Sequence, residues 1–438
     1  MLSILALFLC SAFVLFLLHF EAKQSPDVTR TLWVPTIWFL YIASKPIGLW
    51  LPSSYATPDS SPLDIAFLII LMFIALRILI QRRFDWVNAI KLNAWPIILI
   101  TLWLVSIVWS DIPFVSFKRW IREFQAMLMA FIVLSEPSPH KAMESIIRRM
   151  GFILIPFSPV LIKYFPQYGR LYYGRFGSQQ WTGVAMQKNG LGCICFIAIF
   201  FSIWSILKRR REYSAPLFKY QTFVEIIIII ISLWLMGGPN SDIFYVATAF
   251  YALTLGLFIH WGLHILGKRG IYIGVRSLMI VIAVVIIIGI ATVFTSASFM
   301  GDFASVVGRN STLTGRTEIW AGLLPIAMQK PILGSGFGGF WTWQTRTVHG
   351  VSEAHNGYLE VLLDLGFSGI LFVSFFLLSS CQKAYKELFR NFDFGVLWIS
   401  FIMMTVVYNI TASSINSFCN PLMAILLFLS VSSKDFPV

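Results

Sequence analysis

The strongest candidate for chemistry in this sequence is His355, in the string EAHNGYLE that precedes an apolar run. A histidine side chain exchanges protons near neutral pH and is suited to remove the proton of a hydroxyl group. A helix-capping role explains the position of His355 equally well, and both interpretations stay open. Glu353 either orients the imidazole or interacts with the dipole at the helix start.

Patterns for other kinds of catalysis are absent around this histidine. The sequence shows no Ser-His-Asp order, no paired aspartates and no H-E-x-x-H motif near it. His260 and His264 have an i,i+4 spacing that suits a metal, but no carboxylate accompanies them. The five cysteines show no metal-ligand spacing. We therefore expect no metal site, no cofactor and no covalent enzyme intermediate.

The composition excludes a soluble protein. Of the 438 residues, 58% are hydrophobic and 12% are charged, whereas soluble domains carry about 25% charged residues. Apolar runs predict an all-α polytopic integral membrane protein with about 12–13 transmembrane helices. Because no linker separates domains, we expect one membrane domain, residues 1–438. Pro156, Pro159 and Pro325 indicate broken or re-entrant pieces.

The basic residues predict the orientation. The chain has 33 Lys and Arg against 20 Asp and Glu, and Lys and Arg favour cytoplasmic loops. This rule places residues 208–219 and 268–276 inside, and alternation adds 21–31, 81–93, 135–150, 381–394 and the C-terminus. The eleven basic residues that fall outside are Lys118, Arg119, Arg122, Lys163, Arg170, Arg175, Lys188, Arg309, Arg316, Lys330 and Arg346. Snorkelling and capping explain about half of them, and an anionic ligand such as a diphosphate explains the rest.

The longest external segment, residues 296–356, is the only stretch large enough for a structure outside the spans. Thr314 predicts the N-cap of an outer amphipathic helix. The string PILGSGFGGF, residues 331–340, predicts a turn-rich loop. Trp341 and Trp343 predict aromatic residues at the membrane interface.

Several strings resemble one known family. Three strings resemble the signature of the O-antigen ligase/polymerase superfamily, namely TGRTEIW at 314–320, PILGSGFGGF at 331–340 and EAHNGYLEVLLDLGFSGIL at 353–371. Its exopolysaccharide-production branch is resembled by FKRWIRE at 117–123, IKYFPQYGR at 162–170 and GVAMQKNGLG at 183–192. The resemblance covers most of the chain in the same order.

The resemblance implies a metal-independent C-type glycosyltransferase of the bacterial inner membrane, with residues 296–356 as a large periplasmic loop containing short helices. Such an enzyme transfers a glycan from an undecaprenyl-diphosphate carrier to an acceptor hydroxyl on the periplasmic face. His355 then acts as the base, or near it, and Arg316 binds the diphosphate. The second arginine is Arg170 or Arg175, and we favour Arg175. Further candidates are Lys188 at the diphosphate and, in supporting roles, Glu353, Asn356, Arg309, Arg119 and Arg122.

The chemistry of the transfer fits these residues. Fixed cations would stabilise the charge that grows on the leaving diphosphate, and attack from the opposite face predicts inversion at the anomeric carbon. The expected partners are the lipid-linked donor, a glycan, lipid or protein acceptor, membrane lipids and other polysaccharide-assembly proteins, but no nucleic acid. The sequence does not separate a ligase from a polymerase. A transporter of lipid-linked sugars is the alternative from another class, but the repeated halves typical of transporters are not visible.

Overall fold

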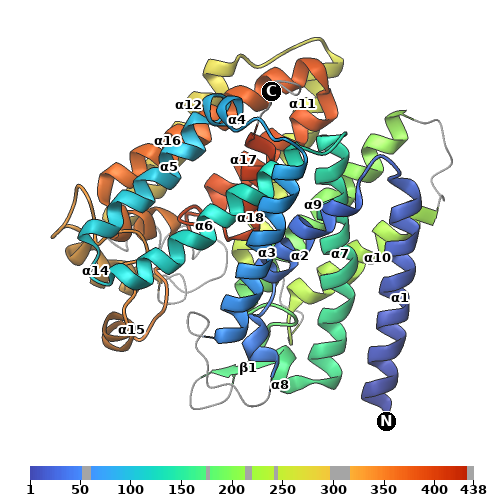
Figure 1. The fold of residues 1–438 in the computed structure, drawn as a ribbon, viewed down its shortest axis with the longest axis horizontal. Helices are drawn as coiled ribbons and strands as arrows, with labels where there is room; N and C mark the ends of the chain where they lie inside the picture. The colour runs from blue at the N-terminus through green and yellow to red at the C-terminus, as the bar shows by residue number, and fades with distance from the viewer. Residues whose placement is uncertain (52–60, 174–177, 213–219, 241–244, 296–315, 432–438) are drawn as a thin grey trace. The chain divides into compact units, whose positions relative to one another are not determined.

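The computed structural model of the protein is built almost entirely of helices (Figure 1). Among the described residues, eight helices are long and apolar enough to cross a membrane, or nine if one bent pair forms a single span. The chain is therefore an all-α polytopic membrane protein, as the composition predicts. The structure describes residues 1–51, 61–173, 178–212, 220–240, 245–295 and 316–431.

The number of qualifying helices is lower than the predicted number of spans, because several apolar runs form short, bent or charged helices. α2 (Trp33–Ala43) and α18 (Pro421–Ser430) are shorter than the ~20 residues that a straight span requires. α4 (Trp86–Leu92) is bent by 93° against the helix that follows it, which begins with α5 (Ala94–Val105). α6 (Pro113–Leu134) carries several charged residues in its first half.

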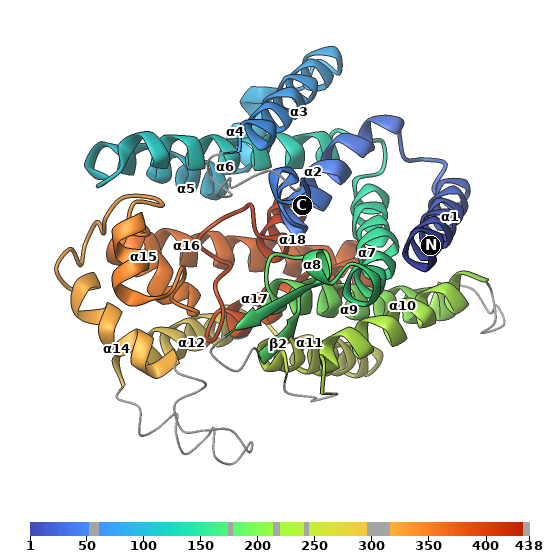
Figure 2. The same cartoon turned by 90° about the horizontal axis from the view of Figure 1, so that it is seen from below.

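The described residues form two compact units, and the first contains residues 1–85 and 127–258. Its remaining elements are α1 (Leu2–Gln24), η1 (Arg30–Leu32), η2 (Ile47–Trp50), α3 (Pro62–Gln81), α7 (Pro139–Tyr164), α8 (Pro166–Gly169), β1 (Arg170–Tyr173), β2 (Ser178–Trp181), α9 (Lys188–Glu212) and α10 (Tyr220–Gly237). α7 packs against α1, α2, α9 and α10, and Figure 1 shows α1 alongside α7. The antiparallel hairpin of β1 and β2 lies next to α8 (Figure 2). α7 is therefore the central helix of this unit.

α7 corrects two predictions. It runs through Pro156 and Pro159 without interruption, so the predicted break at these prolines is wrong. Neighbouring helices surround α7 and support the turns in which proline removes a backbone hydrogen bond. α7 also begins at Pro139, so most of the predicted inner loop, residues 135–150, is helical. Arg149 of this segment is buried and lies 2.8 Å from the Glu21 carboxylate.

The second unit contains residues 86–126 and 259–438. Its remaining elements are η3 (Ser106–Trp109), α12 (Val275–Phe294), α14 (Arg316–Ala327), α15 (Trp343–His349), α16 (Gly357–Arg390) and α17 (Phe392–Tyr408), while α11 (Ala247–Lys268) continues into it from the first unit. α16 packs against α5, α12, α14, α17 and α18, and Figure 1 shows α5 alongside α16. Its backbone leaves the helical conformation at Gly366, whereas α14 continues through Pro325. α16 thus has the break that the sequence placed at prolines.

Aromatic side chains fill the interior of this unit. Trp103 is fully buried and stacks on Phe337, with 4.7 Å between the ring centroids. Phe418 contacts the same indole ring at 4.9 Å. The two compact units do not test whether residues 1–438 form a single domain, so this stays a prediction.

Candidate active site

His355 lies in the short segment between α15 and α16. Its backbone is left-handed, with φ of 53°, a conformation that costs a residue other than glycine about 1–3 kcal/mol. Its Nδ1 atom lies 2.7 Å from the Glu353 Oε1 atom, and each side chain is 24% exposed. The two side chains form a close ion-pair contact, although Nδ1 makes no hydrogen bond among the described residues. The role of His355 as a base stays a prediction.

Asn356 begins α16. Its side-chain oxygen accepts a hydrogen bond from the Leu359 N–H at 3.0 Å, and its side-chain amide donates to the Ile410 carbonyl at 2.9 Å. Asn356 is therefore the N-cap of this helix. The capping role considered for His355 is wrong, because the next residue fills it.

The backbone of Ala354, the residue before the histidine, is held by two buried side chains. The Ala354 N–H donates to Glu360 Oε1, and the Ala354 carbonyl accepts from Trp320 Nε1 at 2.8 Å. Trp320 is on α14, the helix that begins with Arg316. α14 therefore connects the predicted diphosphate-binding arginine to the segment that carries the predicted base.

α14 forms where the sequence predicts a helix, and its location on the outer side stays a prediction. Trp320 and Leu323 are buried in a cluster with Phe340, Ala354 and Leu359, while Ile319 and Leu324 pack against this cluster from its edge. Arg316 is half-buried at the first position of the helix. The predicted cap, Thr314, and the supporting candidate Arg309 lie outside the described residues.

The glycine-rich segment 331–340 forms consecutive turns, as predicted. The Arg119 guanidinium donates to the Gly338 carbonyl, where φ is 61°. Asp364 Oδ1 accepts from the Phe340 N–H at 3.5 Å. Arg119, a predicted supporting residue, thus contacts the backbone of this loop. Arg122 is half-buried on the same helix.

Trp341 corrects the prediction of two interface aromatics. It is buried, and its Nε1 donates to Glu360 Oε2 at 2.7 Å. The indole belongs to the interior because its N–H has a buried acceptor there. Trp343 is 82% exposed on α15, and its interface role stays a prediction.

The remaining diphosphate candidates belong to the first unit. Arg170 Nε donates to the Ile162 carbonyl at 2.6 Å. Lys188 is the first residue of α9, and its Nζ lies 5.1 Å from the centroid of the Tyr245 ring. Arg175 lies outside the described residues. The grouping of Arg170, Arg175 and Lys188 with His355 stays a prediction.

Glu360 and Trp320 are the residues that sequence reasoning missed. Glu360 is 1% exposed in the first turn of α16. The available signal was an acid within an apolar run, since a buried carboxylate is costly unless hydrogen-bond donors satisfy it. Trp320 gave no such signal, because an apolar helix face contains large side chains whatever their hydrogen bonds. Among the described residues, no group of three or more His, Cys, Asp or Glu side chains is placed to hold a metal ion.

Comparison with known proteins matches a region of the chain that contains several of the candidate site residues. Residues 184–374 match the family described as O-antigen ligase, and this segment includes Lys188, Arg316 and His355. The exopolysaccharide production protein ExoQ of Rhizobium meliloti (strain 1021) is 21% identical over 313 residues. The aligned part covers 65% of this chain and 63% of ExoQ, less than two thirds of that protein's length. Both findings confirm the predicted resemblance to the O-antigen ligase/polymerase superfamily.

Proposed function

We propose that this O-antigen ligase-like membrane protein is a glycosyltransferase of polysaccharide synthesis. It transfers a glycan from an undecaprenyl-diphosphate carrier to an acceptor hydroxyl on the periplasmic face of the bacterial inner membrane. The observation that carries the proposal is the His355 imidazole, held against Glu353 in a left-handed backbone, within a segment matched by the O-antigen ligase family.

Deprotonation of the acceptor is the first requirement. The Glu353 carboxylate lies 2.7 Å from Nδ1 of His355, and the imidazole accepts the proton of the acceptor hydroxyl. The acceptor oxygen forms a bond to C1 of the donor sugar while the bond from C1 to the phosphate oxygen breaks. The electron pair of that bond leaves with undecaprenyl diphosphate, and the configuration at C1 is inverted.

Stabilisation of the leaving group is the second requirement. The diphosphate gains one negative charge, and guanidinium groups bind phosphate oxygens in a bidentate manner. Arg316 supplies the compensating positive charge from the start of α14, with Arg175 and Lys188 as further cations. Arg170 is the weaker candidate because its Nε donates to the Ile162 carbonyl. The proposed mechanism needs no metal ion because these cations stabilise the leaving group, and it needs no ATP because the diphosphate linkage supplies the driving force.

A polymerase is the second candidate. The relative named for exopolysaccharide production favours it. A polymerase uses the same donor and differs only in its acceptor, which is a second lipid-linked repeat unit. The acceptor thus separates the two candidates, and the catalytic residues do not.

The test is glycan transfer by purified protein in proteoliposomes with an undecaprenyl-diphosphate oligosaccharide. The acceptors are a second lipid-linked unit, lipid A-core and a protein. His355→Ala should lower the rate by about 10²–10⁴-fold, and Arg316→Ala by about 10²–10³-fold. His349→Ala and Arg346→Ala, which change the same residue types on α15, serve as controls and should stay near the wild-type rate.

Two outcomes would contradict the proposal. Wild-type transfer by either His355→Ala or Arg316→Ala would show that the assigned residue is not part of the site. Movement of the lipid-linked sugar across the vesicle membrane without any transfer would identify a transporter instead. Labelling of residue 355 from the periplasmic side of intact cells tests the orientation, and access from the cytoplasm alone would refute it.

A further inference from the structure

The backbone of Ala354, the residue before His355, is held by side chains from two different helices. The Ala354 N–H donates to Glu360 of α16, and the Ala354 carbonyl accepts from Trp320 of α14. Ala354 itself is fully buried. Both hydrogen-bonding groups of residue 354 are therefore satisfied by side chains, outside any regular backbone pairing.

The two side chains are themselves held in place. Glu360 is 1% exposed, and its second oxygen accepts from Trp341 Nε1 at 2.7 Å. Trp320 is 2% exposed within the cluster of Leu323, Phe340 and Ala354. The Ala354 N–H and carbonyl, the two Glu360 oxygens and the Trp320 N–H all have hydrogen-bond partners. The backbone position of Ala354 is therefore determined by several contacts at once.

Trp320 lies four residues after Arg316 on α14. Residues at this spacing share a helix face and stand one above the other. The hydrogen bond from Trp320 therefore connects the turn that begins with Arg316 to the residue immediately before His355. The link is indirect: it joins the neighbours of the two groups on which the proposed transfer depends, Trp320 on the helix of Arg316 and Ala354 beside His355.

We propose that Trp320 and Glu360 are positioning residues, which set the His355 imidazole relative to Arg316 during glycan transfer. The inference rests on the proposed function. The left-handed backbone at His355 persists only where neighbouring contacts impose it. The contacts at Ala354 impose it from one side, and Asn356, bonded to Leu359 and Ile410, imposes it from the other.

Two conservative variants test the proposal. Trp320→Phe keeps an aromatic ring and removes the N–H donor, and Glu360→Gln keeps the length and removes one acceptor. A displacement of about 1 Å at a reacting group costs up to 10²-fold in rate. We expect each variant to lower kcat by about 10- to 100-fold while KM for the donor changes by less than about threefold.

Matched controls separate positioning from general stability. Trp398→Phe removes a comparable buried hydrogen bond, from Nε1 to Ser380 Oγ at 2.9 Å. Asp64→Asn alters a buried carboxylate that accepts two backbone N–H groups, from Ile47 and Gly48. Both controls should lower the thermal midpoint as the test variants do, yet keep kcat within about twofold of the wild type.

The outcomes decide the proposal. A fall of kcat in either test variant, with unchanged KM and with both controls active, supports it. Wild-type kcat in both test variants, or an equal fall of kcat in tests and controls, would overturn it. If one test variant does not fold, the other decides alone. Retention of activity by His355→Ala would refute the proposed function instead, whatever Trp320→Phe does.

Discussion

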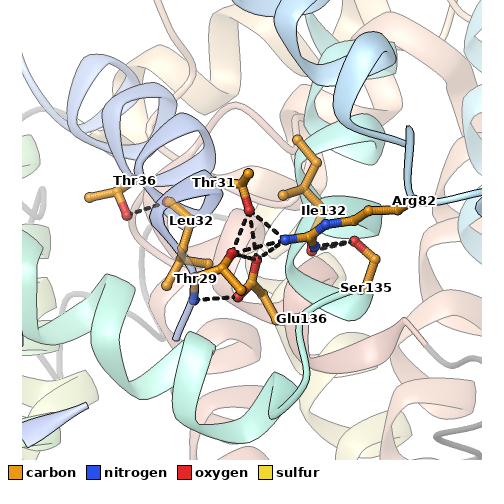
Figure 3. Close-up of polar contacts among 8 residues, drawn as sticks. All are labelled: Thr29, Thr31, Leu32, Thr36, Arg82, Ile132, Ser135 and Glu136. Carbon is orange, nitrogen blue, oxygen red and sulfur yellow. Dashed lines mark hydrogen bonds and ion pairs between the residues drawn. The ribbon is translucent and has the colours of Figure 1, made fainter. Parts of the chain in front are cut away.

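Replacement of Glu136 by glutamine tests how much one buried carboxylate stabilises the first unit. Glu136 lies in the short segment between α6 and α7. The Glu136 carboxylate is fully buried and accepts from the Thr29 N–H at 2.9 Å and from Arg82 Nη2 at 2.6 Å. The hydroxyls of Thr29 and Thr31 donate to the same carboxylate at 2.7 and 3.0 Å (Figure 3). One carboxylate thus joins η1, the end of α3 and the end of α6.

The magnitude follows from the burial of the ion pair. Removing one partner of a buried pair leaves the other charge uncompensated and costs about 3–5 kcal/mol. The Arg82 side chain is 20% exposed and also donates to Ser135 Oγ at 2.6 Å, which lowers the cost. We expect Glu136→Gln to reduce the free energy of unfolding by about 3 kcal/mol.

The effect depends on pH in a defined direction. Burial opposes ionisation of Glu136, but the hydrogen bonds from Arg82 and Thr29 outweigh it and hold its pKa below the ordinary value of 4.5. A depressed pKa in the folded state means that the stabilisation is complete above the unfolded-state pKa and is lost as pH falls through the folded-state pKa. The difference between wild type and Glu136→Gln should therefore be full near pH 7 and shrink below about pH 4.3.

The assay is denaturant unfolding of both proteins in detergent micelles at several pH values, followed by tryptophan fluorescence. Asp27→Asn is the control, since it removes the carboxylate of an exposed pair with Lys141 in the same unit. Exposed pairs contribute about 0–1 kcal/mol. Equal losses for Glu136→Gln and Asp27→Asn at pH 7, or a loss that grows as the pH falls, would refute the reasoning.

Three further predictions concern the site. Gly357→Ala should abolish transfer and lower the thermal midpoint, because the added methyl group would overlap the Asn409 side-chain oxygen; a normal rate would contradict this. Arg170→Gln should lower the thermal midpoint and leave KM for the donor unchanged, because its Nε is bonded to the Ile162 carbonyl, whereas Arg175→Gln should raise KM by about tenfold. EDTA should leave the rate unchanged, and a loss restored by Mg²⁺ would refute metal independence.

The sequence predicted the helical membrane architecture because in lipid every backbone polar group needs an internal partner. It did not predict which apolar runs become complete spans. Length alone hides the short α18 and the bend between α4 and α5. The sequence pattern also predicted a loop at Arg149, because its acidic partner, Glu21, lies far away in the sequence, on α1. Pairing between helices is tertiary information, which the local pattern does not contain.

The candidate site shows the same division. His355 and Arg316 were identified because their motifs are contiguous strings, and their roles remain predictions. Glu360 and Trp320 were missed because the roles proposed for them depend on contacts with Ala354, which Trp320 reaches across 34 residues. A residue that positions another has no motif of its own when its partners lie elsewhere in the chain.

The structure also reduces the number of predicted outer basic residues whose positions need a bound anion as an explanation. Three of them have partners within the protein that explain their positions without a ligand. Lys330 pairs with Asp111 at 2.9 Å, Arg119 donates to the Gly338 carbonyl, and Arg170 donates to the Ile162 carbonyl. A bound diphosphate is therefore not needed to account for these three residues. The proposal of a lipid diphosphate depends instead on individual residues, first of all Arg316, whose helix is hydrogen-bonded to the peptide before His355.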